Sequence, residues 1–235
     1  MLISRMIFGA LNFRRWTLIR SYAKNRARIA QLHNGPDTKE TMALFLKKGF
    51  TKINVGGGEK NLDGFVNIDF QQHKNVKREV TANFLDLSFI PDESLTHIHS
   101  CHAIEHIHHK NLIKQIKEYQ RILQLNGIVS IRCPNALGVS YGFFFGQVPE
   151  TDREDFLKYG YPEDEDFYNP NDGWYCRDLW GLYHWWYAYS GSVTNEHFNL
   201  ITPSKIRELL ESEGFEIQKM TKPETSNIIV IARKS

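Results

Sequence analysis

Short apolar runs bounded by turn residues recur through the middle of the chain. Residues 52–55, 65–69, 95–100 and 128–133 are each predicted to form a strand, because each is a short run rich in apolar residues. Residues 80–87 are expected to form a loop or a short strand. The period of the apolar positions thus favours a sheet through this part of the chain.

Helical spacing appears after the third of these strands. Five apolar residues fall on one face of a helix predicted over residues 110–124, namely Leu112, Ile113, Ile116, Tyr119 and Leu123. The following Asn126-Gly127 is a typical signal for a helix end. Strands that alternate with helices indicate a parallel sheet, with ligands at the carboxyl ends of its strands.

The last part of the chain repeats the alternation. Thr202 and Pro203 are typical of a helix start, so a helix is predicted from there to about residue 212. Residues 215–220 and 227–232 are then two strands, close enough in sequence to form an antiparallel pair.

Residues 138–195 interrupt the alternation and are rich in aromatic and acidic side chains. An insertion of this length is typical of a lid or a binding element. Its aromatic residues have three interpretations: the core of an added subdomain, a platform on which a sugar or another ring stacks, or a cage for a cationic amine. Nucleic acid is not expected as a partner, because acidic side chains repel phosphates.

The first 36 residues differ from the rest, with seven Lys and Arg residues and no acid before Asp37. Apolar residues recur between these bases at roughly helical spacing. The segment is therefore a helix docked on the domain, a basic amphipathic helix on an anionic membrane, or a transit peptide. Residues 37–235 form the main domain, with its insertion at 138–195.

Composition narrows the class of protein. A chain of 235 residues suits one domain with a large insertion, and no apolar run approaches the roughly 18 residues that a spanning helix needs. Three widely spaced cysteines argue against a disulfide framework and against a paired-cysteine zinc site. A reducing, cytoplasmic location is expected, with peripheral membrane contact through the basic segment as the further option.

A glycine turn and an acid provide the first chemical signal. Glycines at 56–58 directly follow a predicted strand, where their backbone N–H groups can approach a ligand closely. Asp69 ends the next strand, where an acid can accept both hydroxyls of a ribose. It follows Gly58 by only 11 residues, whereas dinucleotide folds have ~20, so a nicotinamide enzyme is disfavoured.

Six stretches in this order resemble the class I S-adenosylmethionine (SAM) methyltransferases, and among them the group with a short first helix. They are INVGGG at 53–58, GFVNID at 64–69, DLSF at 86–89, SCHAIEH at 100–106, YQRIL at 119–123 and IRCP at 131–134. The resemblance implies a Rossmann-like α/β fold, a seven-stranded, mostly parallel sheet with an antiparallel last strand pair, here with an aromatic-rich inserted lid. Gly57 stands where this group often has Cys, which we expect to be harmless.

The resemblance also implies a set of cofactor contacts. The glycines would pass under the methionine part of SAM, Asp69 would bind the ribose, and the residues at 86–87 would lie near the adenine. The positions at 100–102 would line the site near the sulfonium. The implied cofactor residues are Gly56, Gly57, Gly58, Asp69, Asp86, Leu87, Ser100, Cys101 and His102.

Histidines supply the candidates for chemistry. Six of them lie between residues 97 and 109, but no cysteine or carboxylate set with zinc spacing joins them, so no metal is expected. Glu105-His106 matches a recurring pair of the family, with either a packing role or contact with cofactor or substrate. His197 follows the insertion, and an imidazole there can take a proton from a substrate hydroxyl or amine. The alternative role for His197 is to tie the insertion to the core.

These observations together predict a SAM-dependent methyltransferase that releases S-adenosylhomocysteine. The methyl acceptor is expected to be an oxygen or nitrogen nucleophile of a small molecule, such as a sugar or glycan intermediate. The alternatives are a SAM-binding partner subunit without catalysis and, less favoured, a nicotinamide-dependent reductase.

Overall fold

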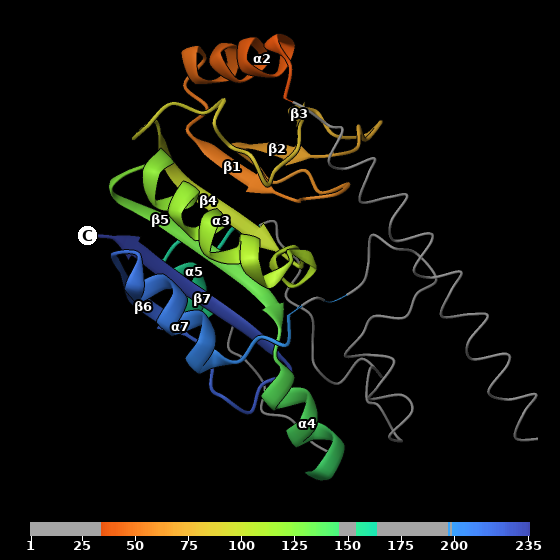
Figure 1. Cartoon of the computed structure of the whole chain (residues 1–235), viewed down its shortest axis with the longest axis vertical. Coiled ribbons are helices and arrows are strands. Elements are labelled where there is room, and N and C mark those ends of the chain that lie inside the picture. The colour runs from red at the N-terminus through yellow and green to blue at the C-terminus, as the bar shows by residue number, and fades with distance from the viewer. Residues whose placement is uncertain (1–33, 146–153, 164–196, 198) are drawn as a thin grey trace, which may run out of the picture.

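The computed structural model describes residues 34–145, 154–163, 197 and 199–235. Its centre is one seven-stranded sheet with the strand order β3-β2-β1-β4-β5-β7-β6 (Figure 1). Strands β1 to β5 pair in parallel, while β7 is antiparallel to both β5 and β6. The predicted mostly parallel Rossmann-like sheet with an antiparallel end is therefore confirmed.

The strands are β1 Lys52–Val55, β2 Phe65–Asp69, β3 Glu79–Thr81, β4 Leu95–Cys101, β5 Leu123–Pro134, β6 Phe215–Met220 and β7 Asn227–Lys234. The sequence pattern located most of them to within one or two residues. The helix-end signal at Asn126-Gly127 is wrong, because both residues lie inside β5. The helix already ends at Ile122, since the buried Leu123 adopts extended backbone and pairs with Leu95 of β4.

The helical elements are α2 Pro36–Lys47, the 3-10 helix η1 Ile104–His106, α3 His109–Ile122, α4 Ala136–Phe145, α5 Glu154–Leu157 and α7 Pro203–Ser212. Helix α7 begins as predicted, with Pro203 at its start and the Thr202 hydroxyl accepting a hydrogen bond of 3.3 Å from the Lys205 N–H. Helices α2 and α4 were not predicted. The first starts at the end of the basic segment, and the second begins two residues before the insertion and continues into it.

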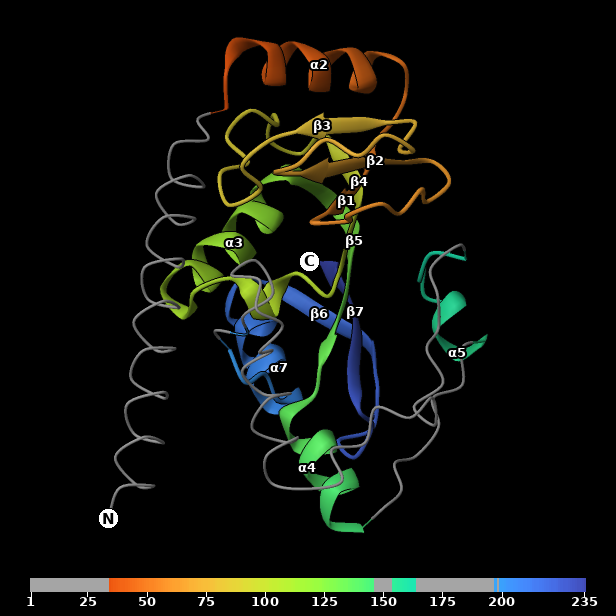
Figure 2. The same cartoon turned by 90° about the vertical axis from the view of Figure 1, so that its right-hand side faces the viewer.

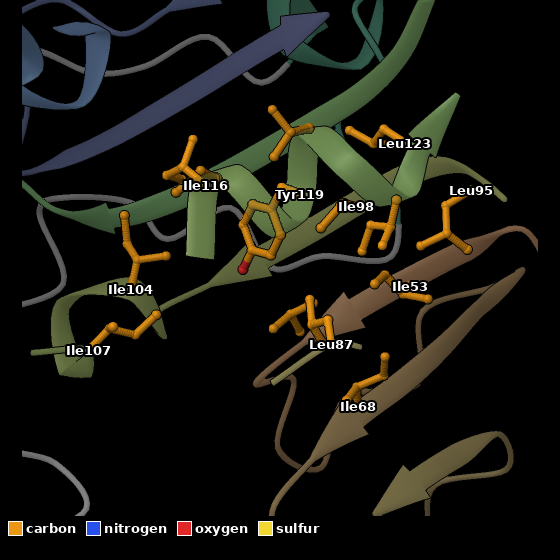
Figure 3. Close-up of a cluster of buried hydrophobic side chains, with 14 of the residues drawn as sticks. Ile53, Ile68, Leu87, Leu95, Ile98, Ile104, Ile107, Ile116, Tyr119 and Leu123 are labelled. Atoms are coloured by element: carbon orange, nitrogen blue, oxygen red, sulfur yellow. The ribbon is translucent and has the colours of Figure 1, made fainter. Parts of the chain in front are cut away.

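Helices α3 and α7 cover one face of the sheet, and α5 lies on the opposite face (Figure 2). The apolar stripe of α3, which includes Leu112, is buried in the main core. Figure 3 shows two of its side chains, Ile116 and Tyr119, among those of the strands. Burial raises the pKa of Tyr119 to about 12. This layer holds the main hydrophobic core and fixes α3 on the sheet.

A row of polar side chains crosses the sheet on its other face. Asn67, Asn54, His99 and Ser130 are neighbours in register across β2, β1, β4 and β5, and each is at most 2% exposed. The ring of Tyr161, just after α5, packs edge-on against His99 at 5.4 Å between ring centroids. We refer to these four side chains as the polar row, and its β2 and β1 end leads to the glycine turn.

Two regions singled out by the sequence lie largely outside the described residues. They are the basic segment, of which residues 1–33 are not described, and most of the 138–195 insertion with its tryptophans. Their assigned roles remain predictions. Within the described part of the chain, no helix has both the length and the apolar character that crossing a bilayer requires.

Candidate functional site

The candidate site lies where the order of strands reverses. From β1 the chain proceeds to β2 and β3 on one side, and β4 then lies on the other side of β1. In open parallel sheets, ligands bind outside the carboxyl ends of the strands at such a reversal. The glycine turn follows β1, Asp69 ends β2, and at this same edge Cys101 ends β4 and His102 follows it.

The glycine turn packs closely against the end of β4. Gly56 and Gly58 adopt positive φ angles of 66° and 55°, which favour glycine. A Cβ atom on Gly56 would lie 2.7 Å from the Cβ of Ala103, whereas one on Gly58 would meet no atom within 4 Å. The turn therefore packs against the residues after β4 at Gly56, whereas the space beside Gly58 is unfilled.

Gly57 is restricted by the polar row. A Cβ atom on this residue would lie 2.0 Å from Asn67 Oδ1 and 2.1 Å from Asn54 Nδ2. The two amides fill the space that a larger side chain would need. Glycine at position 57, where the group that the sequence resembles often has Cys, thus goes with this local packing arrangement.

Asp69 holds the turn in place. Its carboxylate accepts hydrogen bonds from the Gly58 N–H at 3.0 Å and from the Gln71 N–H at 3.1 Å, one on each oxygen. The residue is only 5% exposed. Because a carboxylate has about four acceptor positions, both oxygens keep capacity for a further hydroxyl donor. The structure thus brings Asp69 and the glycines together, as the sequence predicted for one site.

The residues predicted near the adenine lie in the loop after β3. Asp86 is exposed, and its carboxylate accepts a hydrogen bond of 3.1 Å from the Ser88 N–H. Leu87 is fully buried in the main core, and this anchors the loop. The predicted adenine contact of Leu87 is its backbone N–H, and burial of the side chain does not decide whether that N–H is accessible.

Three polar residues to which the sequence analysis assigned no role fix this loop. Arg121 of α3 donates to the carbonyl oxygens of Leu87 at 3.0 Å and Ile90 at 2.9 Å. Gln115, also of α3, donates to the Phe84 carbonyl at 2.8 Å. Asn34, before α2, accepts from the Asn83 N–H at 2.8 Å and donates to the Asp86 carbonyl at 2.6 Å. Their polar side chains gave no signal in sequence, since their partners lie 31 or more residues away.

Two aromatic rings accompany the glycine turn. Phe84 lies so close that a Cβ on Gly56 would be 3.8 Å from its ring atoms. Phe70 directly follows Asp69, and its ring centroid is 6.2 Å from that of Phe84. Both side chains are only partly buried.

The three residues predicted to line the site after β4 differ in exposure. Ser100 is fully buried, Cys101 is partly buried, and the His102 side chain is 43% exposed. His102 has a positive φ of 50°, unusual for a residue with a side chain, where the chain turns out of β4. His102 is thus the most accessible of the three.

Glu105 is the buried centre of a group of histidines. Its side chain is 2% exposed, and its Oε1 lies 3.2 Å from His102 Nδ1 and 3.9 Å from His106 Nε2. Burial acts to raise the pKa of Glu105, but the hydrogen bond with His102 and the charges of His102 and His106 outweigh it and lower that pKa. Glu105 is therefore a buried carboxyl group held between two imidazoles.

His197 joins this group from a distant part of the chain. Its ring centroid lies 5.1 Å from that of His106. The next described residue, Asn199, donates from its backbone N–H to the Glu105 carbonyl at 3.3 Å and from its side chain to the Ile107 carbonyl. The segment that follows the insertion is thus fastened to η1, beside the predicted cofactor residues.

The remaining histidines of the 97–109 cluster lie elsewhere. His97 Nε2 and His99 Nδ1 both lie within hydrogen-bond distance of the Ser130 hydroxyl, at 2.9 and 2.8 Å. His108 precedes α3, where its Nδ1 accepts from the Lys110 N–H at 3.4 Å, and His109 is exposed. The cluster seen in sequence therefore divides into a buried pair in the sheet, a helix start and the group around Glu105.

Buried His97 predicts acid sensitivity of the fold. Burial, with smaller contributions from His99 and Lys52, lowers the pKa of His97 to about 3. Between that value and 6.5 the unfolded chain binds a proton that the folded protein does not, so stability falls as the pH falls. From pH 6.5 to 4.5, the wild type should lose about 2–3 kcal/mol of unfolding free energy more than His97→Gln.

Urea unfolding of both proteins at several pH values measures this difference. Glutamine can still reach the Ser130 hydroxyl but does not titrate, which makes it the matched replacement. Parallel stability curves for the two proteins would show that His97 does not carry the effect.

Comparisons with known proteins were made at three levels. No family model matches the chain, and no curated protein sequence matches it. Among solved structures, a SAM-dependent methyltransferase from Archaeoglobus fulgidus shares 13% identity, covering 83% of this chain and 94% of that one, with a TM-score of 0.48. One from Mesorhizobium loti shares 12%, covering 77% and 90%, with a TM-score of 0.46.

A third similar structure is the complex between the Haloferax volcanii Trm112 methyltransferase activator and a methyltransferase. The matched chain shares 10% identity, with 83% of this chain and 88% of that one covered and a TM-score of 0.49. Likeness at this level extends to the fold alone. The class I arrangement of this protein is defined by its own strand order, with β7 antiparallel between β5 and β6.

Proposed function

We propose that the protein is a SAM-dependent methyltransferase acting on an oxygen or nitrogen atom of a small molecule. The observation that carries the proposal is the link between Asp69 and the glycine turn at the strand reversal. The Gly58 N–H donates to Asp69 Oδ2 there, and the open side of the turn lies next to the free acceptor positions of the carboxylate. This arrangement suits a ligand that has a ribose with two free hydroxyls.

The connection between β1 and β2 favours SAM over a dinucleotide. Residues 56–64 are all described and contain no helix. Dinucleotide folds place a helix N-terminus after the glycine turn, and it binds the pyrophosphate. SAM has no phosphate, so the missing helix removes nothing that SAM requires. The nicotinamide-dependent alternative loses its main anion site for the same reason.

The neighbouring residues complete the proposed cofactor site. Phe70 and Phe84 offer aromatic faces beside Asp69, on which an adenine ring can stack. Asp86 is exposed in the loop after β3 and can accept a hydrogen bond from the adenine amino group, while the Leu87 N–H faces a ring nitrogen in this assignment. Bound SAM would supply a methyl group on a positively charged sulfur.

The acceptor is expected on the side of η1. Ala103 contacts the glycine turn. The group around Glu105 lies next to Ala103 along the chain and contains His102, His106 and His197. In this proposal His197 removes the proton of the acceptor, and the histidines exposed at this edge orient it. Because a sugar can stack on the aromatic side chains of the insertion, a sugar or glycan intermediate is among the acceptors to be tested.

Replacing Asp69 tests the cofactor assignment. Hydrogen bonds to a charged group contribute about 1.5–3 kcal/mol each, so Asp69→Ala should weaken SAM binding at least tenfold, by about 1.4 kcal/mol or more. Calorimetry with SAM, S-adenosylhomocysteine and NAD measures this and compares the ligand classes. Asp63→Ala, at a side chain 93% exposed, is the matched control and should leave affinity unchanged.

The outcomes separate the alternatives. Unchanged SAM affinity in a folded Asp69→Ala protein would contradict the role of Asp69. Preference for NAD would favour the reductase. SAM binding without release of S-adenosylhomocysteine on any of a broad panel of alcohols, sugars and amines would favour a non-catalytic partner subunit.

A further inference from the structure

We propose that Glu105, His106 and His197 form a binding site for one divalent transition-metal ion, with zinc as the best match. The three side chains each offer one ligand atom, and these atoms lie within 4.8 Å of one another. No pattern in the sequence pointed to this site, because 91 residues separate its two histidines. The inference extends beyond the methyl-transfer proposal and does not require it.

The distances are compatible with coordination after small side-chain rotations. Zinc binds imidazole nitrogen and carboxylate oxygen at about 2.0–2.2 Å, so tetrahedral ligand atoms lie about 3.4 Å apart. The observed separations, up to 4.8 Å, exceed this value by little more than 1 Å. Rotation of the partly exposed histidine rings can close that gap without moving the backbone.

Glu105 provides a second, independent observation. Its side chain is 2% exposed, and its Oε2 has no hydrogen-bond partner among the described residues. A buried carboxylate oxygen without a partner is costly, and a bound cation would satisfy it. His102 holds the other oxygen at 3.2 Å, as the outer partners of metal-binding carboxylates do.

The two parts of the chain that carry the ligands are already joined. Asn199 binds the backbone of Glu105 and Ile107, on either side of His106. Asn199 is thus held at η1, two residues after His197, by hydrogen bonds to backbone oxygens that do not involve the ligand side chains. A site held in this way needs little reorganisation on binding.

The ligand types select the ion and its role. Two imidazoles and one carboxylate suit zinc, ferrous iron or cobalt, whereas magnesium and calcium prefer oxygen ligands. Three protein ligands leave at least one position open, which is typical of catalytic and not of structural sites.

The open coordination position of the ion would take the methyl acceptor, an assignment that rests on the proposed function. An acceptor oxygen bound to the ion loses its proton more easily, so the ion activates the acceptor and His197 acts as a ligand instead of a base. The proposal thereby favours an acceptor with a hydroxyl group over one with an amine alone.

Cobalt and zinc titrations of the full-length protein test the site. One Co²⁺ per chain should produce visible absorption bands, Zn²⁺ should abolish them, and millimolar Mg²⁺ should not. His106→Ala and His197→Ala should each weaken binding by more than 100-fold, and His102→Ala by about 10–100-fold, the usual effect of an outer partner. His109→Ala, which removes an exposed histidine nearby, is the matched control and should bind like the wild type.

Circular dichroism and thermal unfolding show whether each variant is folded. Zinc should raise the melting temperature of the wild type and of His109→Ala equally, that of His102→Ala less, and those of His106→Ala and His197→Ala least. Absence of cobalt bands, or equal binding by wild type and the folded His106→Ala and His197→Ala variants, would overturn the metal proposal. SAM binding in calorimetry is independent of these titrations, so a failed metal site leaves the methyltransferase proposal standing, with His197 as base.

Discussion

Replacement of His197 by alanine is expected to lower turnover by roughly 10²–10⁴-fold, the usual contribution of a group that moves a proton in the transition state. The affinity for SAM should change little, because the cofactor contacts come from the glycine turn, Asp69 and the loop after β3. Turnover is measured as release of S-adenosylhomocysteine with any acceptor found in the panel, and affinity by calorimetry.

A chelator distinguishes the two roles of His197. If His197 is a base, chelation leaves the wild-type rate unchanged. If it is a ligand, chelation lowers the wild-type rate toward that of His197→Ala, and zinc restores only the wild type. His109→Ala should match the wild type throughout. Full turnover in a folded His197→Ala protein would exclude both roles and leave His197 as a tie between the insertion and the core.

Replacement of Gly57 by alanine is expected to destabilise the protein by about 1–3 kcal/mol and to weaken SAM binding. The new methyl group would overlap Asn67 Oδ1 and Asn54 Nδ2, at 2.0 and 2.1 Å. Both amides are buried in the sheet and cannot move into solvent, so the turn itself must shift, as in other overpacked sites. Urea unfolding should show a lower midpoint with an unchanged slope.

Gly64→Ala is the matched control for this change. Gly64 also lies between β1 and β2 and has a positive φ of 74°, but a Cβ there would meet no atom within 4 Å. It should cost only the backbone strain, about 1 kcal/mol, and leave SAM affinity unchanged. Equal stability and equal SAM affinity for the two variants would contradict the role assigned to the two amides.

The fold could largely be predicted because its signals are local. Strands β1 and β2 begin and end as the apolar runs indicated, and α7 has the cap and proline that mark its start. The pattern failed at Asn126-Gly127, which lie inside β5, in the irregular stretch between Leu123 and Ile128, the two residues that pair with β4 on either side of it. Helix α2 was missed because its apolar residues are consecutive, at 42–46, and do not recur at helical spacing; Met42 alone is fully buried.

The candidate site was only partly predictable. The glycines and Asp69 are 11 residues apart and their contact follows from adjacent strands, so the sequence could place them together. The meeting of His106 with His197 depends on how the chain returns after a long insertion, which no local pattern encodes. The support of the loop by Arg121 and Asn34 is equally non-local, since each binds main-chain atoms at least 31 residues away.

The hydroxyl of Ser130 also determines how hydrogens are distributed within the sheet. His97 Nε2 and His99 Nδ1 both face this one oxygen, which has a single hydrogen to donate. At most one of the two nitrogens can accept it, so the other must carry a hydrogen of its own. The tautomers of the two rings are therefore coupled across β4 and β5, and a change of tautomer in one ring requires the hydroxyl to reorient and limits the tautomers open to the other.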